Sequence, residues 1–368
     1  MHRVLFIIIF FHCGLFARKV ETFYGLIEVS EPVILELIDS PPMQRLKKVY
    51  QYGISHFTTH KENYTRYDHS LGVFAILRLK DATLEEQIAG LLHDVSHTVF
   101  SHVGDYVFEP NSLEERGKAY QDNIHGWFLE KYGIGKILEK HGFTIAELEP
   151  TRESFPALEQ NLPDLCADRI DYNLQGAFHR KYLSKNEVLE ILQNLQFTGG
   201  RWISTKPDLI KKMVRYSLFM NRDCWGSHEN YVTSCWLAEI ISRGLKVGKI
   251  TFEDIHFGTD ENIWNRLRQI PDPQVQERFY RIFHPKRYYK LVETRKADIV
   301  TKRKFRGIDP WIQEGNQLFR LTELDQELKA EYEQEKSLME AGWSIKYSAA
   351  SICGAEDLVI DRLVELFA

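Results

Sequence analysis

The chain has 368 residues, of which 43% are hydrophobic and 27% are charged, with a formal net charge of −5. This composition is typical of a folded globular protein and excludes collagen-like, disordered and multi-span membrane proteins. A single core rarely grows beyond roughly 250–300 residues, so there is room for one large domain or two ordinary ones. Because nucleic-acid coats depend on an excess of Lys and Arg, we expect that no nucleic-acid partner is required.

The N-terminal segment MHRVLFIIIFFHCGLFA places one Arg before an apolar run that ends in Ala17. The run is too short for a membrane span, which needs about 20 apolar residues, but it fits the hydrophobic part of a secretory signal. A buried N-terminal strand is the alternative, because VLFIII is apolar and rich in β-branched residues. We favour a signal peptide over residues 1–17 and hence export to the periplasm or secretion, with the cytoplasm as the alternative. No membrane span is expected.

Apolar residues recur at helical spacing over most of the chain after Pro41 and Pro42. A first helix is predicted in MQRLKKVYQYG, and LGVFAILRL and EEQIAGLLHDV together predict a helical hairpin. Further helices are predicted at residues 122–132, 164–178, 185–195, 207–222 and 228–244. Between the third and fourth of these, QFTGGRWIS alternates apolar and polar residues around two glycines, which is typical of a small β-hairpin.

The predicted fold is mainly α with minor β: a helical bundle over residues 18–292 with one inserted β-hairpin, then a minor α+β C-terminal appendage over residues 293–368. The appendage contains a segment of strand character, KADIVTKRKFRGIDPWI, and a charged, exposed helix, LTELDQELKAEYEQEKSLMEA. Nine basic residues lie between Lys286 and Arg306 against two acids. Such a run predicts either an anion site, for polyphosphate or a nucleic-acid strand, or a solvated face that balances the acidic helix. We favour the solvated face.

Histidines crowd one part of the chain, where four of them fall within 34 residues: His69, His93, His97 and His102. Asp94 follows His93 at the end of an apolar helix, where an uncompensated carboxylate would be costly. Asp168 is a plausible further ligand, because a predicted helix places it on one face with Tyr172. Imidazole and carboxylate together suit a first-row divalent ion and leave positions for water and phosphate. We expect one divalent ion, which could be Mn, Fe, Mg, Co or Zn.

The arrangement of these residues resembles a known family. The H…HD…D pattern of His69, His93–Asp94 and Asp168 resembles the HD-domain metal-dependent phosphohydrolases. The surrounding segments DSPPMQRLKKVYQYG, TRYDHSLGV, IAGLLHDVSHTVFSH and ADRIDY resemble the deoxynucleoside triphosphate triphosphohydrolase (dGTPase) branch, which includes an animal enzyme that couples a SAM domain to an HD domain. The resemblance covers about Lys19 to Val292, and we expect no SAM domain here.

The resemblance implies a role for each matching residue. The metal ligands would be His69, His93, Asp94 and Asp168. His102 and Asp105 match a histidine and an aspartate that act on the bridging or leaving oxygen. This pairing makes physical sense, because a neighbouring carboxylate fixes the tautomer of a histidine and raises its pKa, so that the ring can donate a proton.

Two further histidines and an arginine match the pocket of the family. His97 lies one helical turn past His93 and would face the same cavity, with a supporting or core position as the alternative. His125 matches another pocket histidine, and a core position is again the alternative. Arg66 matches an arginine that contacts phosphate, for which a bidentate guanidinium is well shaped.

The remaining matches concern substrate binding. Arg169 stands where the family has a Lys, and Tyr172 matches a Tyr that contacts the phosphate chain or sugar. The alternatives are a surface salt bridge and a core aromatic. Gln51 matches the position that contacts the sugar 3′-hydroxyl. Gly176 departs from the pattern, because the family has an Asp against the sugar at this position.

The resemblance implies metal-dependent hydrolysis of a phosphoester. The expected reaction converts a deoxynucleoside triphosphate, such as dGTP, to deoxynucleoside and triphosphate. One alternative is a phosphomonoesterase or cyclic-nucleotide phosphodiesterase of the same superfamily. Another, of a different class, is a binding module that senses nucleotide without hydrolysing it. The resemblance also implies a homo-oligomer.

Overall fold

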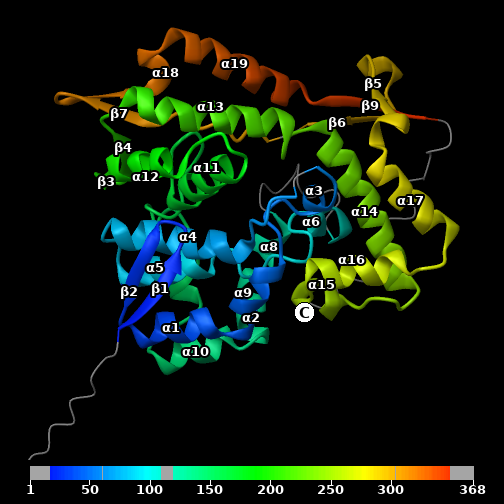
Figure 1. Ribbon diagram of the computed structural model, residues 1–368, viewed down its shortest axis with the longest axis horizontal. Coiled ribbons are helices and arrows are strands. Elements are labelled where there is room, and N and C mark those ends of the chain that lie inside the picture. Colours follow the sequence, from blue (N-terminus) through cyan, green and yellow to red (C-terminus); the bar gives the residue numbers. More distant parts are fainter. Residues whose placement is uncertain (1–16, 60, 109–118, 303, 349–368) are drawn as a thin grey trace, which may run out of the picture.

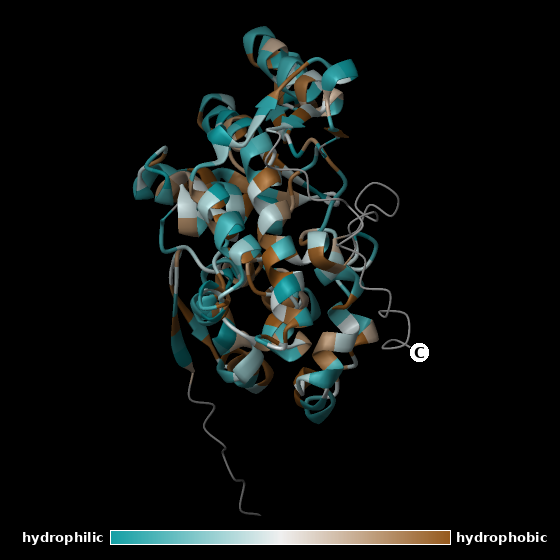
Figure 2. Ribbon diagram, turned by 90° about the vertical axis from the view of Figure 1, so that its right-hand side faces the viewer, coloured by the Kyte–Doolittle hydropathy of each residue, from teal (hydrophilic) through white to brown (hydrophobic). Residues whose placement is uncertain are grey.

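The computed structural model describes residues 17–59, 61–108, 119–302 and 304–348 (Figure 1). Apart from its last residue, the predicted signal peptide lies outside these ranges. The described chain is mainly helical with three small sheets, which confirms the predicted fold class. Figure 2 shows hydrophilic and hydrophobic residues alternating along most helices, as expected of helices that bury one face.

The N-terminal part of the described chain consists of a β-hairpin and short helices. Strand β1 (Arg18–Thr22) pairs antiparallel with β2 (Gly25–Val29). Next come α1 (Pro32–Asp39), α2 (Pro41–Arg45), the 3-10 turn η1 (Leu46–Lys48) and α3 (Ile54–Thr58). The helix predicted after Pro41 is therefore shorter than expected, and the hairpin and α1 were not predicted.

The predicted metal ligands lie on or directly after three helices: His69 on α4 (Arg66–Leu79), Asp168 on α11 (Ala167–His179), and His93–Asp94 just past the end of α5 (Leu84–Leu92). Helix α4 packs against both of the others. Thr65 and Asp68 form a reciprocal capping box at its start, since the Thr65 N–H donates to Asp68 and the Asp68 N–H donates to the Thr65 hydroxyl. This cap makes Arg66 the first helical residue and places His69 one turn inside the helix.

Gly72 sets how closely α4 and α11 approach each other. A Cβ atom built on Gly72 would lie 1.9 Å from Oδ1 of Asp171 on α11. Any side chain at this position would therefore push the two helices apart. The glycine allows Asp171 to lie beside α4, within reach of His69.

The helices predicted in the middle of the chain match the structure, apart from a break in the first. Short helices α6 (Val103–Phe108) and α8 (Tyr120–Asn123) precede α9 (His125–Lys131), so the helix predicted at 122–132 is interrupted at Ile124. Next come α10 (Ile134–Lys140) and η2 (Ala146–Leu148). The predicted hairpin is β3 (Leu195–Thr198) and β4 (Arg201–Ser204), and it lies between α12 (Lys185–Asn194) and α13 (Pro207–Asp223). Helix α14 (His228–Lys246) follows.

Short helices and strands make up the rest of the described chain. Helix α14 is followed by α15 (Phe252–Phe257), α16 (Asp260–Arg268), α17 (Pro273–Phe283) and the 3-10 turns η3 (Pro285–Arg287) and η4 (Thr294–Lys296). Strand β9 (Trp343–Tyr347) lies between β5 (Tyr289–Leu291) and β6 (Ile299–Thr301) in one sheet. In another sheet, β7 (Trp311–Glu314) pairs with β4 in parallel and with β8 (Gln317–Arg320) antiparallel. The predicted domain boundary at residue 292 stays a prediction, and elements on both sides of it share this sheet.

Helices α18 (Leu321–Leu324) and α19 (Gln326–Ala341) occupy the segment predicted as one exposed, charged helix. Helix α19 runs alongside α13 (Figure 1) and buries Leu328 and Met339. Arg215 on α13 pairs with Glu331 on α19 at 2.6 Å. One face of α19 is thus buried, because its apolar residues recur at the spacing of helical turns between the charged ones.

The buried apolar residues form two clusters, and the candidate site lies between them. The first cluster includes Phe74 of α4 and Leu174 of α11. The second includes Val103 of α6 and Trp236 of α14. Across the residues that the structure describes, no helix is both long and apolar enough to span a membrane.

Candidate metal centre and its pocket

The four predicted metal ligands meet at one place, although they come from three separate parts of the chain. Nε2 of His69 lies 3.2 Å from Nε2 of His93, 3.0 Å from Oδ1 of Asp168 and 3.5 Å from Oδ2 of Asp94. Nε2 of His93 lies 3.6 Å from the same oxygen of Asp168. His69, His93 and Asp94 each offer a ligand atom within 4.8 Å of the other two.

The hydrogen bonds of the two imidazoles show that a metal ion fits between them. Nδ1 of His93 donates to the carbonyl of Gly90 at 2.8 Å, and Nδ1 of His69 lies 2.6 Å from a carboxylate oxygen of Asp171. With a metal bound, each ring would keep its proton on Nδ1 and present a lone pair on Nε2. Two lone pairs 3.2 Å apart cannot form a hydrogen bond. Nitrogens that each lie roughly 2.0–2.2 Å from one ion have about this separation, so these residues fit a divalent ion.

The charges around the imidazoles also favour a cation. The carboxylates of Asp94, Asp168 and Asp171 all lie within 3.5 Å of the His69 ring nitrogens. Burial lowers the pKa of His69, but hydrogen bonds to Asp168 and Asp171 outweigh burial and raise it to about 10. In the absence of a metal, a proton thus supplies the positive charge that the site requires. A bound divalent ion would displace this proton.

Asp94 is held from two sides. Arg66 donates from Nη1 to Oδ2 of Asp94 at 2.5 Å, and His97 donates from Nε2 to Oδ1 at 3.1 Å. Burial acts to raise the pKa of Asp94, but Arg66 and His97 hold it well below its usual range. Burial and the charge of Arg66 lower the pKa of His97 to about 3, so its ring is neutral. Arg66 also donates from Nε to the hydroxyl of Ser101 at 3.0 Å.

A strained turn leads into His102. Phe100 and Ser101 have φ angles of 60° and 55°, which residues other than glycine rarely adopt. Asp260 at the start of α16 accepts the backbone N–H of Phe100 at 2.7 Å and that of Tyr50 at 2.9 Å. Ser101 donates its hydroxyl to the carbonyl of Tyr50 at 2.8 Å. The buried carboxyl of Asp260 and the Ser101 hydroxyl thus fix the turn.

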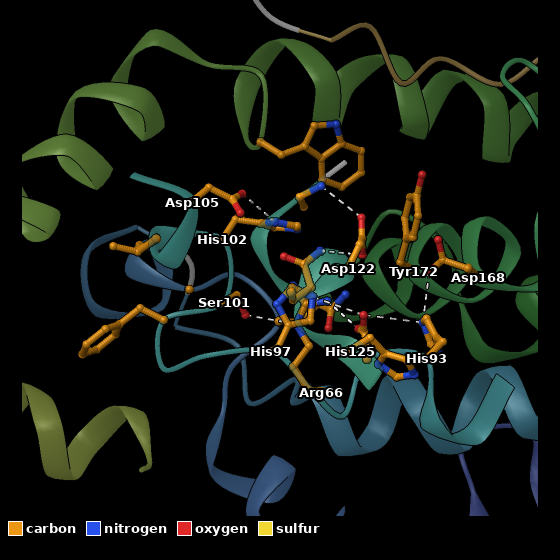
Figure 3. A pocket seen from close by; sticks show the side chains of 18 of the residues that line it. Arg66, His93, His97, Ser101, His102, Asp105, Asp122, His125, Asp168 and Tyr172 are labelled. Carbon is orange, nitrogen blue, oxygen red and sulfur yellow. Dashed lines mark hydrogen bonds and ion pairs between the residues drawn. The ribbon is translucent and has the colours of Figure 1, made fainter. Parts of the chain in front are cut away.

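His102 and Asp105 form the predicted pair. Nδ1 of His102 lies 3.3 Å from Oδ2 of Asp105, whose other oxygen accepts the backbone N–H of Tyr120 at 2.8 Å. The side chain of His102 is 47% exposed, whereas that of Asp105 is 5% exposed. Figure 3 shows this pair on one side of the pocket, with His93 and Asp168 on the other.

The other predicted pocket residues lie near this centre, each with its own surroundings. Nδ1 of His125 lies 3.0 Å from the hydroxyl of Ser96, and burial lowers the pKa of His125 to about 4. Oε1 of Gln51 is buried and has no hydrogen-bond partner among the described residues. The ring of Tyr172 packs edge-on against Trp225 at a centroid distance of 5.5 Å. Oε1 of Gln51, which has no partner among the described residues, is thus available to accept a hydrogen bond from a ligand.

Arg169 and Gly176 differ most from what the resemblance implies. The guanidinium of Arg169 donates to the carbonyls of Asp164 and Gln160 at 2.8 and 2.7 Å, so much of its donor capacity is used within the protein. A Cβ atom on Gly176 would lie 2.7 Å from the hydroxyl of Tyr216 and 3.1 Å from that of Tyr52. Two phenols therefore occupy the space next to Gly176. The role of Arg169 in substrate binding stays a prediction.

A cavity of about 630 Å³ connects these side chains, and every predicted site residue except His69 lines it. His69 is 1% exposed, and its contacts with His93, Asp94 and Asp168 place it directly beneath the wall. The lining also includes three basic residues from the run predicted as a solvated face: Lys302, Lys304 and Arg306. Lys302 and Lys304 are also exposed, so these side chains face solvent as predicted and border the cavity as well.

Sequence reasoning did not assign a role to several residues around the centre. Asp171 was noted only for its helical spacing, although an acid on the buried face of α11 could have suggested a partner for His69. No local pattern marked Ser101 or Asp260, because their partners Arg66 and Phe100 lie on other parts of the chain.

Comparisons with known proteins agree with this geometry. Residues 66–172 match the family model described as the HD domain. The chain is 36% identical to the uncharacterized protein YdhJ of Bacillus subtilis over 76% of this chain and 84% of that protein. It is 29% identical to metal-dependent phosphohydrolase cns2 of Cordyceps militaris over 71% of this chain and 76% of that protein.

More distant similarities concern a named triphosphohydrolase and the fold. The deoxynucleoside triphosphate triphosphohydrolase SAMHD1 of Xenopus laevis is 26% identical over 34% of this chain and 23% of that protein. A solved phosphohydrolase structure from Bacteroides thetaiotaomicron has a TM-score of 0.65 and 16% identity, and the match covers 90% of this chain and 99% of that one. At this level of identity, the likeness shows a shared fold.

Proposed function

The chain belongs to the HD-domain superfamily of metal-dependent phosphohydrolases, and from this premise we propose that it hydrolyses deoxynucleoside triphosphates to deoxynucleoside and triphosphate. The observation that carries the proposal is the arrangement of the four metal ligands, Arg66 and the His102–Asp105 pair around one cavity. Its volume of about 630 Å³ lies within the range of small-molecule sites, roughly 300–1,000 Å³. The similarity to SAMHD1 supports the choice of substrate.

The metal would be held by His69, His93, Asp94 and Asp168. A divalent ion at such a site polarises a phosphoryl oxygen and lowers the pKa of bound water toward neutrality. Asp171 and the carbonyl of Gly90 orient the two imidazoles for this task. Arg66 keeps Asp94 ionised and lines the cavity, where its guanidinium adds positive charge next to the reacting phosphoryl group.

His102 is the proposed proton donor. Water attacks the α-phosphorus, a bond forms between the water oxygen and that phosphorus, and the bond to the 5′ oxygen of the nucleoside breaks. His102, oriented through Nδ1 by Asp105, donates the proton from Nε2 to the 5′ oxygen. The proton released by water then returns the histidine to its starting state. The exposed ring of His102 and the buried, fixed carboxylate of Asp105 suit this division of roles.

His97 and His125 have surroundings that suit support rather than proton transfer. His97 is 1% exposed and donates to Asp94, and its low pKa keeps it neutral. His125 lies against Ser96, and burial keeps its pKa near 4. We assign both rings to positioning the centre. Gln51 and Tyr172, which line the cavity, are assigned to contacts with the substrate.

Hydrolysis of a phosphomonoester or cyclic nucleotide is the second candidate. The observation that favours it is Gly176, which supplies no carboxylate for a sugar and lies against the phenols of Tyr52 and Tyr216. The two candidates differ in their products. The phosphomonoesterase releases single phosphates, whereas the proposed reaction leaves the triphosphate intact.

The proposal can be tested by incubating the purified protein with a panel of deoxynucleoside and ribonucleoside mono-, di- and triphosphates and cyclic nucleotides, with Mn²⁺ or Mg²⁺. Products are then separated by ion-exchange chromatography. We expect triphosphate and deoxynucleoside in equal amounts. Orthophosphate from monophosphates would favour the second candidate, and tight nucleotide binding without any product would indicate a sensing module.

A further inference from the structure

Three basic side chains from the C-terminal part of the described chain line the same cavity as the metal ligands: Lys302, Lys304 and Arg306. Elsewhere in this basic run, Arg295 and Lys296 both pair with Glu293. Within the described ranges, no carboxylate lies at ion-pair distance, 4.0 Å or less, from any of the three cavity-lining cations. Among the described residues, the cavity therefore contains three positive charges without a direct ion-pair partner.

The backbone that carries these side chains is fixed on both sides. Thr301, at the end of β6, pairs with Trp343 of β9. At the other end, the backbone N–H of Arg306 donates to Oδ1 of Asn221 on α13 at 2.8 Å. Between them, the ring of Phe305 packs edge-on against Tyr332 of α19 at 5.1 Å. Strand pairing, ring packing and a backbone hydrogen bond thus hold Thr301, Phe305 and Arg306 in place.

Electrostatic interactions connect this segment to the metal centre through α11. Burial raises the pKa of the Tyr172 phenol, the charge of Asp168 raises it further, and the charge of Arg306 lowers it. Partial burial, followed by the charges of Arg306 and Arg169, lowers the pKa of Lys304, while more distant acids oppose this shift. The part of this shift that comes from the two arginines reflects repulsion between neighbouring positive charges. A bound anion would relieve that repulsion.

We propose that Lys302, Lys304 and Arg306 bind the part of a polyphosphate chain that extends beyond the reacting phosphoryl group. This inference rests on the proposed function, because it takes the metal centre and Arg66 as the place where the reacting phosphoryl group lies. The three side chains would then be the residues that select triphosphates over monophosphates.

Charge supports a polyphosphate more than a monoester. A phosphomonoester carries about two negative charges, and the metal ion and Arg66 can balance them. A triphosphate brings additional charge on the phosphates that do not react. Arg169, which the resemblance places on the phosphates, uses two of its nitrogens on carbonyls of its own chain. Among the described residues, the remaining Lys and Arg side chains on the cavity wall are Lys302, Lys304 and Arg306.

Replacing these charges gives a direct test with a matched control. The variant Lys302→Gln, Lys304→Gln, Arg306→Gln removes two lysines and one arginine from the cavity. The control Lys290→Gln, Arg295→Gln, Lys296→Gln removes the same residue types from outside it. We expect the cavity variant to raise KM for the triphosphate about 10- to 100-fold with a smaller change in kcat, and the control to leave both within about twofold. An unchanged KM in the cavity variant would overturn the proposal.

A binding measurement decides the inference even if the proposed reaction is wrong. Calorimetric titration with inorganic tripolyphosphate and with orthophosphate, in excess Mg²⁺, needs no turnover. We expect the intact protein to bind tripolyphosphate at least about tenfold more tightly, and the cavity variant to lose this preference while keeping its thermal transition. Equal affinity for the two anions in the intact protein would overturn the proposal. A single-stranded oligonucleotide that outcompetes tripolyphosphate for this segment would also overturn it, in favour of nucleic acid.

Discussion

Nδ1 of His69 and Oδ2 of Asp171 lie 2.6 Å apart, in a part of the core where both side chains are almost fully buried. The same carboxylate accepts hydrogen bonds from Tyr24, Tyr64 and Gln175. Four donors thus fix Asp171, and Asp171 in turn directs the Nε2 lone pair of His69 toward the other predicted ligands.

Replacing Asp171 with asparagine should therefore weaken metal binding. The substitution preserves the shape of the side chain but removes the charge that fixes the tautomer of His69. Loss of such a partner typically lowers metal affinity about 10- to 100-fold. Titration of the metal-free protein with Mn²⁺ or Zn²⁺ measures the effect. Asp208→Asn removes an exposed carboxylate from α13 and should leave the affinity unchanged. Equal affinities in the two variants would contradict this role of Asp171.

A methyl group at Gly72 should destabilise the protein. Because a Cβ atom there would lie 1.9 Å from Asp171, Gly72→Ala forces α4 and α11 apart. Overpacking of this kind costs about 1–3 kcal/mol in the free energy of unfolding. Gly126→Ala is the matched control, since the nearest atom to its Cβ is 3.9 Å away and alanine favours the helix. Denaturant titration should show a loss only for Gly72→Ala.

Removing the ring of His102 should abolish most turnover without affecting the metal. In His102→Gln, no group donates a proton to the leaving oxygen, and general acid catalysis typically contributes about 10²- to 10⁴-fold. His284→Gln replaces an exposed histidine outside the cavity and should keep full activity. The measurement combines kcat with metal content. A His102→Gln variant that loses its metal would place this residue in the metal site instead.

Asp260 should stabilise the turn before His102. The two carboxyl oxygens of Asp260 accept the backbone N–H groups of Phe100 and Tyr50. The side chain of asparagine has a single oxygen, so it keeps only one of these hydrogen bonds. An unsatisfied buried amide costs about 1–3 kcal/mol, so Asp260→Asn should lower both stability and kcat at pH 5. Glu261→Gln changes the neighbouring, exposed acid and should alter neither by more than about 0.5 kcal/mol or twofold.

The effect of Asp260→Asn on stability should also depend on pH. Burial raises the pKa of Asp260 to about 7, whereas an aspartate in the unfolded chain titrates near 3.9. Between these values, the folded protein keeps a proton that the unfolded chain has lost. The contribution of Asp260 to stability therefore falls as pH rises from about 4 to about 7. The difference in unfolding free energy between the natural protein and Asp260→Asn should shrink over this range. A constant difference would show that Asp260 does not titrate there.

Candidates for the metal ligands could be named from the sequence, because part of their pattern is local and the whole pattern resembles that of a known family. His93 and Asp94 are adjacent on the chain, and Asp168 lies on a helix whose apolar spacing is clear. Periodicity also predicted helices α12, α13 and α14 and the hairpin between the first two, since these elements are stabilised by contacts between near neighbours in sequence.

Two features could not be predicted in this way: the basic side chains of Lys302, Lys304 and Arg306 on the cavity wall, and the turn at Phe100 and Ser101. Lys304 reaches the cavity only because β6 pairs with β9 and Arg306 is anchored on α13. Asp260 stabilises Phe100 across 160 positions of sequence. The spacing of residues in the sequence carries no information about such contacts. From the sequence alone, a basic run that lines a cavity therefore looks the same as one that only faces solvent.

The most direct test of the central claim measures metal content and triphosphate release on the same samples. The samples are the natural protein and the double variant His93→Ala, Asp94→Ala. We predict that the natural protein holds a divalent ion and releases triphosphate from a deoxynucleoside triphosphate, and that the double variant does neither. Triphosphate release by a double variant that holds no metal would contradict the account.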